Sequence, residues 1–228
     1  MDSTNYRGNH LNLNKLRPKE ELKEESRSIL LGCLTISPRI NSPKDQEDHQ
    51  VWRESVIVYF QEIEQHLLKH IQSADYIIGC VAWLTNENIL SALSQKKGVK
   101  IIVNKEDFLS SQTSSYTNKQ LIQNWYPKIP SFNFSESCLG TAILTFGIAN
   151  HPSRLHHKFL IFYNSELQPQ GVWTGSYNFT RNSNFSLENA IYLEDSNIIQ
   201  QYIQEFHFIL QHSESYDWKC NMLVIPDT

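Results

Sequence analysis

The stretch Leu155–Phe162 reads LHHKFLIF and joins a polar start to an uninterrupted apolar run. Successive side chains of a β-strand point to opposite faces, so His156 and Lys158 point together and His157 points away. The run Phe159–Phe162 has no polar gap, which is typical of a strand covered on both faces. The stretch therefore predicts a buried strand that begins with an imidazole and an ammonium side by side.

Further along the chain, a second polar group follows a second apolar strand. Val172–Thr174 is expected to be a short strand, and it leads into Gly175, Ser176 and Asn178. A glycine lets a backbone amide approach an anion closely, and the other two side chains add neutral hydrogen-bond donors. Together with Lys158, these groups could bind the non-bridging oxygens of a phosphate. The imidazole would then supply a nucleophile for phosphorus or a proton for the departing oxygen.

A carboxylate comes next, at Glu188, just before the apolar strand Ala190–Leu193. A carboxylate that is hydrogen-bonded to one imidazole nitrogen fixes the tautomer and leaves the other nitrogen free to attack. We assign this orienting role to Glu188. Arg154 and Arg181 lie near the motif in sequence and could form a local cationic patch, although scattered cations are commonly plain surface.

The front half of the chain alternates strands and helices. This alternation predicts a mixed, largely parallel β-sheet. The helix at 197–211 carries one apolar stripe and should pack on the sheet, giving helices on both faces. The expected front elements are a strand at 56–60, a helix around 63–71, a strand at 76–81, a helix that Thr85 caps and that ends at Gly98, and a strand at 99–103.

These residues resemble a known family. His156-x-Lys158, Gly175-Ser176-x-Asn178 and Glu188-Asn189 match the signature, called the HKD motif, of the phospholipase D superfamily. The resemblance is nearest to single-motif bacterial nucleases and nuclease-like members, which read Trp-Thr-Gly-Ser-Phe-Asn-Phe-Thr where this chain has WTGSYNFT at 173–180. It spans roughly Val56 to Trp218 and implies the phospholipase D/nuclease fold. One position departs: Tyr163 stands where the family usually has an aspartate with a supporting role.

The resemblance also implies an assembly. Covalent cleavage of a phosphodiester needs one group to attack and another to protonate the leaving oxygen, and the chain has one motif without an internal repeat. Single-motif members imply a two-fold homodimer in which two copies of His156 share one site. Lys158 and Asn178 of both chains would surround the phosphate in place of a divalent metal. We therefore expect a metal-independent nuclease for DNA or RNA with a phosphohistidine intermediate and no cofactor.

Two other functions stay open. The same chemistry would serve a phospholipid phosphodiesterase, but the sequence has no membrane span and no evident basic amphipathic helix, so stable membrane association is not expected. A binding or scaffolding module with decayed chemistry would account for the tyrosine at the aspartate position and for the acidic net charge of −4. In that case the arm at 1–50 would be the functional part.

Composition limits the remaining possibilities. The 228 residues are expected to form a catalytic domain at 51–228 and a polar arm at 1–50, partly disordered or ordered by a partner. The four cysteines are widely separated and form no Cys-x-x-Cys pair, which indicates a reduced, cytoplasmic protein. The pI of about 6.1 gives no global basic footprint, so phosphate backbones would be bound locally.

Three further patterns have competing interpretations. His66 and His70 have the spacing of two metal ligands on a helix, but the glutamate of a His-Glu-x-x-His site is missing, which disfavours a metal role. The acidic pair in Lys105–Asp107 follows a strand and could line a site or cap the next turn. Trp125 and Tyr126 could stack on bases or cover the core.

Overall fold

The computed structural model describes residues 56–110, 123–132, 140–152 and 154–225. Its strands are β1 (Val56–Tyr59), β2 (Tyr76–Val81), β3 (Gly98–Asn104), β4 (Ile143–Phe146), β5 (Lys158–Tyr163), β6 (Pro169–Gly175), β7 (Ala190–Leu193) and β8 (Ser213–Ser215). Its helices are α2 (Ile63–Ser73), α3 (Glu87–Leu93), α5 (Ser196–Gln211) and the 3-10 turns η2 (Asp107–Leu109), η3 (Tyr126–Lys128) and η4 (Arg181–Phe185). The predicted arm at 1–50 lies outside the described residues, and its separation from the domain stays a prediction.

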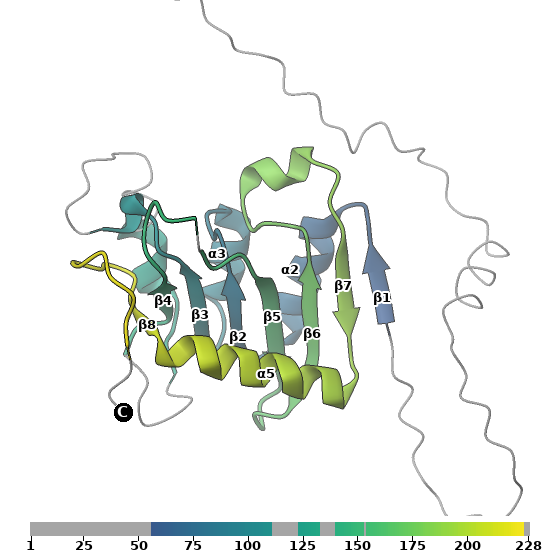
Figure 1. Cartoon of the computed structure of the whole chain (residues 1–228). Helices are drawn as coiled ribbons and strands as arrows, with labels where there is room; N and C mark the ends of the chain where they lie inside the picture. Colours follow the sequence, from purple (N-terminus) through teal and green to yellow (C-terminus); the bar gives the residue numbers. More distant parts are fainter. Residues whose placement is uncertain (1–55, 111–122, 133–139, 153, 226–228) are drawn as a thin grey trace, which may run out of the picture. The chain divides into compact units, whose positions relative to one another are not determined.

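Within these residues, eight strands form one sheet in the order β1-β7-β6-β5-β2-β3-β4-β8 (Figure 1). The expected mixed α/β fold is confirmed, but the sheet is not largely parallel. Strand β3 runs parallel to β2 and β4, whereas every other neighbouring pair in the described sheet is antiparallel. The connection between β5 and β6 is short, and strands joined by a short connection pair antiparallel. In addition, β1 does not lie beside β2 and β3, which follow it in the sequence; it pairs with β7 and forms one edge of the sheet.

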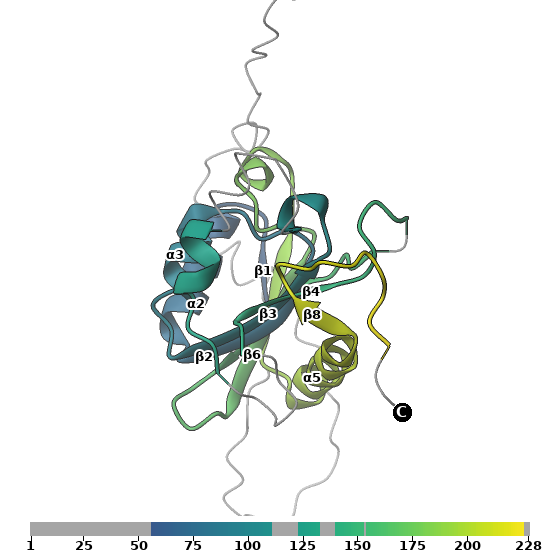
Figure 2. The same cartoon turned by 90° about the vertical axis from the view of Figure 1, so that its left-hand side faces the viewer.

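Helices cover both faces of the sheet, as expected. Figure 2 shows α2 and α3 on one side and α5 on the other. One prediction about α3 is wrong: its cap is Asn86, whose side chain accepts hydrogen bonds from the backbone N–H groups of Asn88 (2.9 Å) and Ile89 (3.3 Å). The backbone N–H of Thr85 instead donates to the carbonyl of Phe179 at 2.9 Å, which attaches this connection to the segment after β6.

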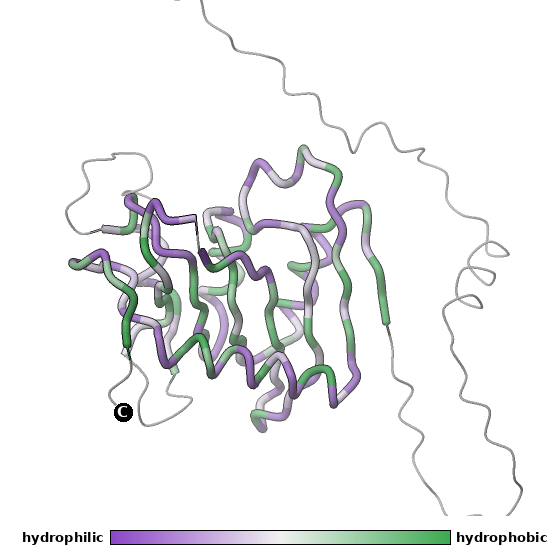
Figure 3. The backbone as a smooth tube through the Cα atoms, viewed as in Figure 1, coloured by the Kyte–Doolittle hydropathy of each residue, from purple (hydrophilic) through white to green (hydrophobic). Residues whose placement is uncertain are grey.

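Strand β5 lies inside the sheet, between β2 and β6, and all its residues are buried. Its alternate side chains enter the two hydrophobic layers: Leu160 and Phe162 join the layer under α2 and α3, and Phe159 and Ile161 join the layer under α5. The chain is hydrophilic where it approaches β5 and hydrophobic within the strand (Figure 3). The apolar run therefore buries β5 inside the sheet, and the polar residues at its start lie where the neighbouring strands end.

Candidate active site

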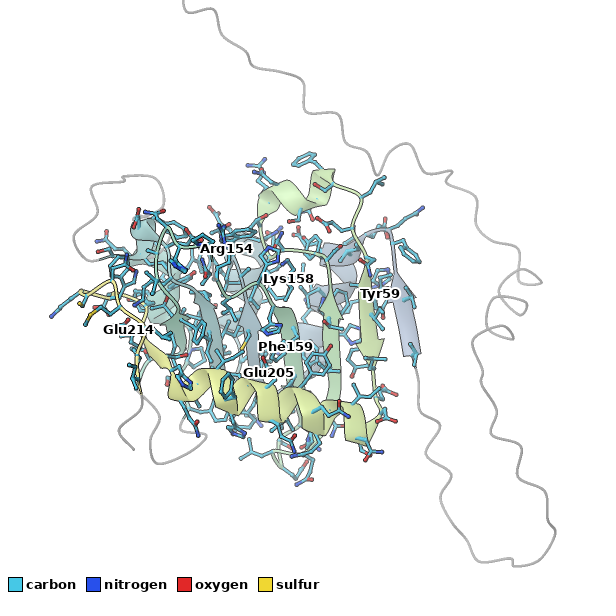
Figure 4. The ribbon with its side chains drawn as sticks, viewed as in Figure 1. Tyr59, Arg154, Lys158, Phe159, Glu205 and Glu214 are labelled. Atoms are coloured by element: carbon cyan, nitrogen blue, oxygen red, sulfur yellow. The ribbon has the colours of Figure 1, made fainter. Side chains whose placement is uncertain are left out.

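The start of β5 holds the imidazole and the ammonium together. The Nζ atom of Lys158 lies 3.2 Å from Nδ1 and 3.3 Å from Nε2 of His156, and it donates to the His156 carbonyl at 2.8 Å. The lysine is only 7% exposed. His157 faces the other way, and its Nε2 atom lies 3.0 Å from Oε1 of Glu205 on α5. Figure 4 shows Lys158 at the start of β5, with Phe159 and Glu205 beside α5.

The ends of β6 and β7 bring the second polar group into place. Gly175 pairs with Ala190, and a Cβ atom on Gly175 would lie 2.2 Å from the Asn189 carbonyl oxygen, so no larger residue fits there. The next residue, Ser176, donates its hydroxyl hydrogen to the Glu188 carboxylate and accepts the Asn189 N–H at 3.1 Å. Close packing at the glycine thus holds the hydroxyl and the carboxylate at one point of the sheet edge.

Glu188 was expected to orient the His156 imidazole, but among the described residues of one chain it makes no hydrogen bond to that ring, and its hydrogen-bond partner is Ser176. Its charge acts on Lys158 instead: burial lowers the pKa of that ammonium, and the nearby Glu188 carboxylate opposes the shift. Within one chain, Glu188 therefore stabilises the cation of the motif.

The charges around His156 favour its neutral form. Partial burial lowers the pKa of His156 below its ordinary value of 6.5, and the positive charges of Lys158 and Arg154, followed by His157, act in the same direction. A neutral imidazole has the free lone pair that a nucleophile or a general base needs. Arg154 is exposed at the same edge of the sheet.

A tryptophan that sequence reasoning missed lies against this pair. The Trp83 ring meets the His156 ring edge to face, with centroids 5.4 Å apart, and Lys158 Nζ lies 6.0 Å from the Trp83 ring centroid. The Trp83 indole N–H donates to Glu106 at 3.0 Å. The available signal was its place directly after β2, since strand ends often line sites in α/β sheets.

A second missed residue, Asn104, connects these groups at the end of β3. Its amide nitrogen donates to Glu106 at 2.7 Å, and its amide oxygen accepts the backbone N–H of Leu155 at 3.0 Å. The carboxylate that holds Trp83 is therefore tied to the residue just before His156. Lys105 pairs with Glu214, and the Asp107 carboxylate accepts a hydrogen bond from the Asn150 amide. Of the acidic pair at 106–107, Glu106 thus supports the site.

The other sequence patterns have structural contacts. His66 stacks on Tyr59 with centroids 4.3 Å apart, and the Tyr59 hydroxyl lies 3.0 Å from His70 Nε2. In the part of the chain that the structure describes, no group of three or more histidine, cysteine or acidic residues is placed to hold a metal. Tyr126 is 3% exposed and donates its hydroxyl hydrogen to the Leu84 carbonyl at 2.9 Å, so it covers the core.

A pocket of about 420 Å³ adjoins the motif. We call it the side pocket; it is lined by Trp83, Thr85, Phe108, Asn178, Thr180, Asn182, Ser183, Ser186 and Glu188. The amide oxygen of Asn178 is buried and has no hydrogen-bond partner within the described residues. Asn178 thus places a side-chain amide on the wall of the side pocket.

A family model described as "Cardiolipin synthase, PLD-like domain" matches residues 67–210 of this chain. The chain belongs to the phospholipase D superfamily. This membership supports a phosphodiesterase-type hydrolase. The matched range contains β5, β6 and β7 and therefore every residue of the signature predicted from the sequence.

One relative covers most of the chain, and two solved structures share its fold. An uncharacterized protein of Acanthamoeba polyphaga mimivirus is 39% identical over an alignment of 212 positions, which covers 81% of this chain and 75% of the relative. NucT from Helicobacter pylori superposes with a TM-score of 0.53 at 15% identity, covering 72% of this chain and 99% of NucT. Nuc from Salmonella typhimurium, a phospholipase D family member, gives a TM-score of 0.51 at 18% identity, with 73% and 100% covered.

The structure brings most of the predicted phospholipase D signature to one edge of the sheet. Direct contacts join His156 to Lys158 and Ser176 to Glu188, and the side pocket joins Asn178 to Glu188. Arg181 begins η4 and makes no hydrogen bond or ion pair with these side chains in the described part of the chain. Tyr163 lies buried at the opposite end of β5, roughly 16 Å of strand away from Lys158.

Proposed function

We propose that this protein is a metal-independent nuclease that cleaves DNA or RNA phosphodiesters in the cytoplasm through a covalent phosphohistidine. The observation that carries this proposal is the pairing of His156 with the buried ammonium of Lys158, 3.2 Å apart, at the edge that also holds Ser176 and Glu188. A neutral imidazole beside a fixed cation is the arrangement that nucleophilic attack on a phosphate anion needs.

In the first step, one neutral His156 imidazole attacks phosphorus and forms a nitrogen–phosphorus bond, while the leaving oxygen takes a proton from a second histidine that is in the protonated, imidazolium form. In the second step, that second imidazole removes a proton from water, which attacks phosphorus and releases the first histidine. Lys158 and the amide nitrogen of Asn178 bind the non-bridging oxygens and stabilise the charge that develops on them. The nearby Glu188 carboxylate favours the charged form of Lys158 and opposes the effect of burial on its pKa.

The second imidazole comes from a second copy of the chain. The sequence contains one His-x-Lys motif of this kind, and His156 is exposed, so another subunit can approach it. A two-fold axis through the site would place two His156 side chains on opposite sides of one phosphate. Sedimentation of the full chain should give a dimer, and specific activity should fall on dilution below the dimer dissociation constant.

A nuclease is favoured over a phospholipid phosphodiesterase by the lining of the side pocket. Most of its side chains carry amides or hydroxyls, which suit a polar substrate better than an acyl chain. Across the described ranges, no helix has both the length and the apolar character needed to span a bilayer. A decayed module is disfavoured because Tyr163, which replaces the usual aspartate, lies far from His156 along β5.

The decisive experiment offers the full chain labelled DNA and RNA oligonucleotides, and separately phospholipid vesicles, each in the presence of EDTA. We expect cleavage of oligonucleotides with undiminished rate in EDTA and an acid-labile phosphate on His156 after rapid quenching. Loss of activity in chelator that added Mg²⁺ restores would contradict the metal-independent route. Headgroup release from vesicles without oligonucleotide cleavage would assign the site to phospholipids, and a folded dimer inactive on all substrates would identify a binding module.

A further inference from the structure

The side pocket differs in chemistry from the motif it adjoins. Two aromatic residues, Trp83 and Phe108, lie on its wall, and the remaining lining residues carry amides or hydroxyls apart from Glu188. None of its described lining residues is a lysine or an arginine. Phosphates are usually bound by such cations, whereas aromatic rings with neutral hydrogen-bonding groups suit a nucleobase. The wall chemistry therefore indicates a neutral, flat group beside the scissile phosphate.

The Trp83 ring is held in a fixed orientation. Its N–H donates to Glu106, which also accepts a hydrogen bond from Asn104, so the ring cannot rotate without breaking a hydrogen bond. A ring fixed before binding loses little conformational entropy when a ligand stacks on it. Through Asn104 the same connection reaches Leu155, which precedes His156. A base held against Trp83 would therefore lie at a defined distance from the attacking imidazole.

Glu188 and Asn178 connect the pocket to the phosphate site. Both line the pocket, and Glu188 also acts electrostatically on Lys158. The pocket therefore shares two residues with the signature, so a ligand whose phosphate binds at the motif would lie next to the pocket. The volume of about 420 Å³ lies in the range of sites for small organic groups, about 300–1,000 Å³.

We propose that the side pocket is a nucleoside subsite, in which Trp83 and Phe108 hold the base of a nucleotide that flanks the scissile phosphate. This inference rests on the proposed nuclease function, which it deepens by naming the part of the substrate that binds outside the motif. It makes Trp83 a specificity-determining residue, although its contact with His156 alone would suggest a purely supporting role.

The test measures binding to the full chain with His156→Asn, which prevents turnover and retains a polar side chain. The ligands are a thymidine dinucleotide and two analogues, each of which lacks one base and keeps its sugar and phosphate. We expect one analogue to bind about tenfold to a hundredfold more weakly than the dinucleotide, because stacking of one base on an aromatic side chain has that effect. Adding Trp83→Leu should abolish the difference, whereas Trp83→Phe should retain most of it.

Trp125→Leu is the matched control, since Trp125 lies outside the pocket and contacts Lys128. It should leave the difference between the ligands intact. Phe108→Leu tests the second aromatic wall and decides the matter if Trp83→Leu does not fold. Equal binding of the dinucleotide and both analogues would overturn the subsite, as would a Trp83→Leu loss that is the same for all three ligands.

A parallel cleavage assay with the unsubstituted chain separates this inference from the proposed function. Cleavage of oligonucleotides without any base-dependent binding would overturn the subsite and leave the nuclease. Base-dependent binding that Trp83→Leu removes, in a chain that cleaves no nucleic acid, would support the subsite and overturn the nuclease.

Discussion

His156 and His157 are neighbours in sequence but belong to different parts of the molecule. His156 lies beside Lys158 at the site, where partial burial and the neighbouring positive charges lower its pKa. His157 lies on the opposite face, where its ring pairs with Glu205 of α5, with side chains 46% and 44% exposed. The alternation of a single extended segment thus assigns one imidazole to chemistry and the other to the attachment of a helix.

The largest expected difference is between the alanine variants of the two histidines. His156→Ala should lower the cleavage rate by at least about a thousandfold, because removal of a covalent nucleophile has effects of this order or greater. His157→Ala removes an exposed contact with Glu205 on the opposite face and should keep most of the activity. Single-turnover cleavage of a labelled oligonucleotide, with circular dichroism to check folding, measures both. Comparable losses in two folded variants would show that the wrong face of the strand has been assigned to catalysis.

A smaller effect is expected when the charge beside His156 is removed at nearly constant shape. Lys158→Met keeps the buried aliphatic stem and should reduce the cleavage rate about a hundredfold to a thousandfold, as the loss of one group that stabilises developing charge does. Lys128→Met is the matched control, because Lys128 also lies over a tryptophan ring, at 5.1 Å, but outside the site. A Lys158→Met variant as active as the control would remove the lysine from the mechanism.

Gly175 allows the close backbone approach that holds Ser176 and Glu188 at the site. Gly175→Ala would place a Cβ atom 2.2 Å from the Asn189 carbonyl oxygen, and the strands must separate to admit it. We expect a loss of about 1–3 kcal/mol in the free energy of unfolding, together with lower activity as Ser176 moves. Gly140→Ala is the control, since an added Cβ there meets none of the described residues within 4 Å. Equal denaturation midpoints for the two variants would contradict this account.

The local part of this arrangement could be predicted from the sequence because it depends on local rules. Alternation placed His156 with Lys158, and the apolar run placed β5 inside the sheet. Pairing partners depend on contacts between distant segments, which explains why a largely parallel sheet was expected although β1 pairs antiparallel with β7. The cap of α3 was misplaced by one residue because threonine and asparagine are both good caps.

The supporting residues of the site could not be predicted for the same reason. Trp83 follows β2, whereas Asn104 and Glu106 lie at the end of β3, so Trp83 meets them only after the sheet has formed. Glu188 was expected to orient an imidazole, but its neighbour across the β6 and β7 ends is Ser176, which accounts for its observed hydrogen bond. Sequence order identifies candidate groups, whereas the register of the strands decides which of them touch.

The smallest expected effect is a change in the pKa of His156 when the nearby charge of Arg154 is removed. The attacking imidazole must be neutral, so the cleavage rate should fall as the pH drops through its pKa, which lies below the ordinary 6.5. Arg154→Gln removes a positive charge that opposes protonation, so the pKa rises and the acidic limb of the pH–rate profile moves to higher pH. Arg154 is exposed, so we expect a shift of roughly a few tenths of a pH unit at low ionic strength, decreasing as salt is added. Arg181→Gln, which removes an arginine without a described contact to the motif, should leave the limb in place. A limb that moves to lower pH in Arg154→Gln would mean that the titrating group is not an imidazole held neutral by this cation.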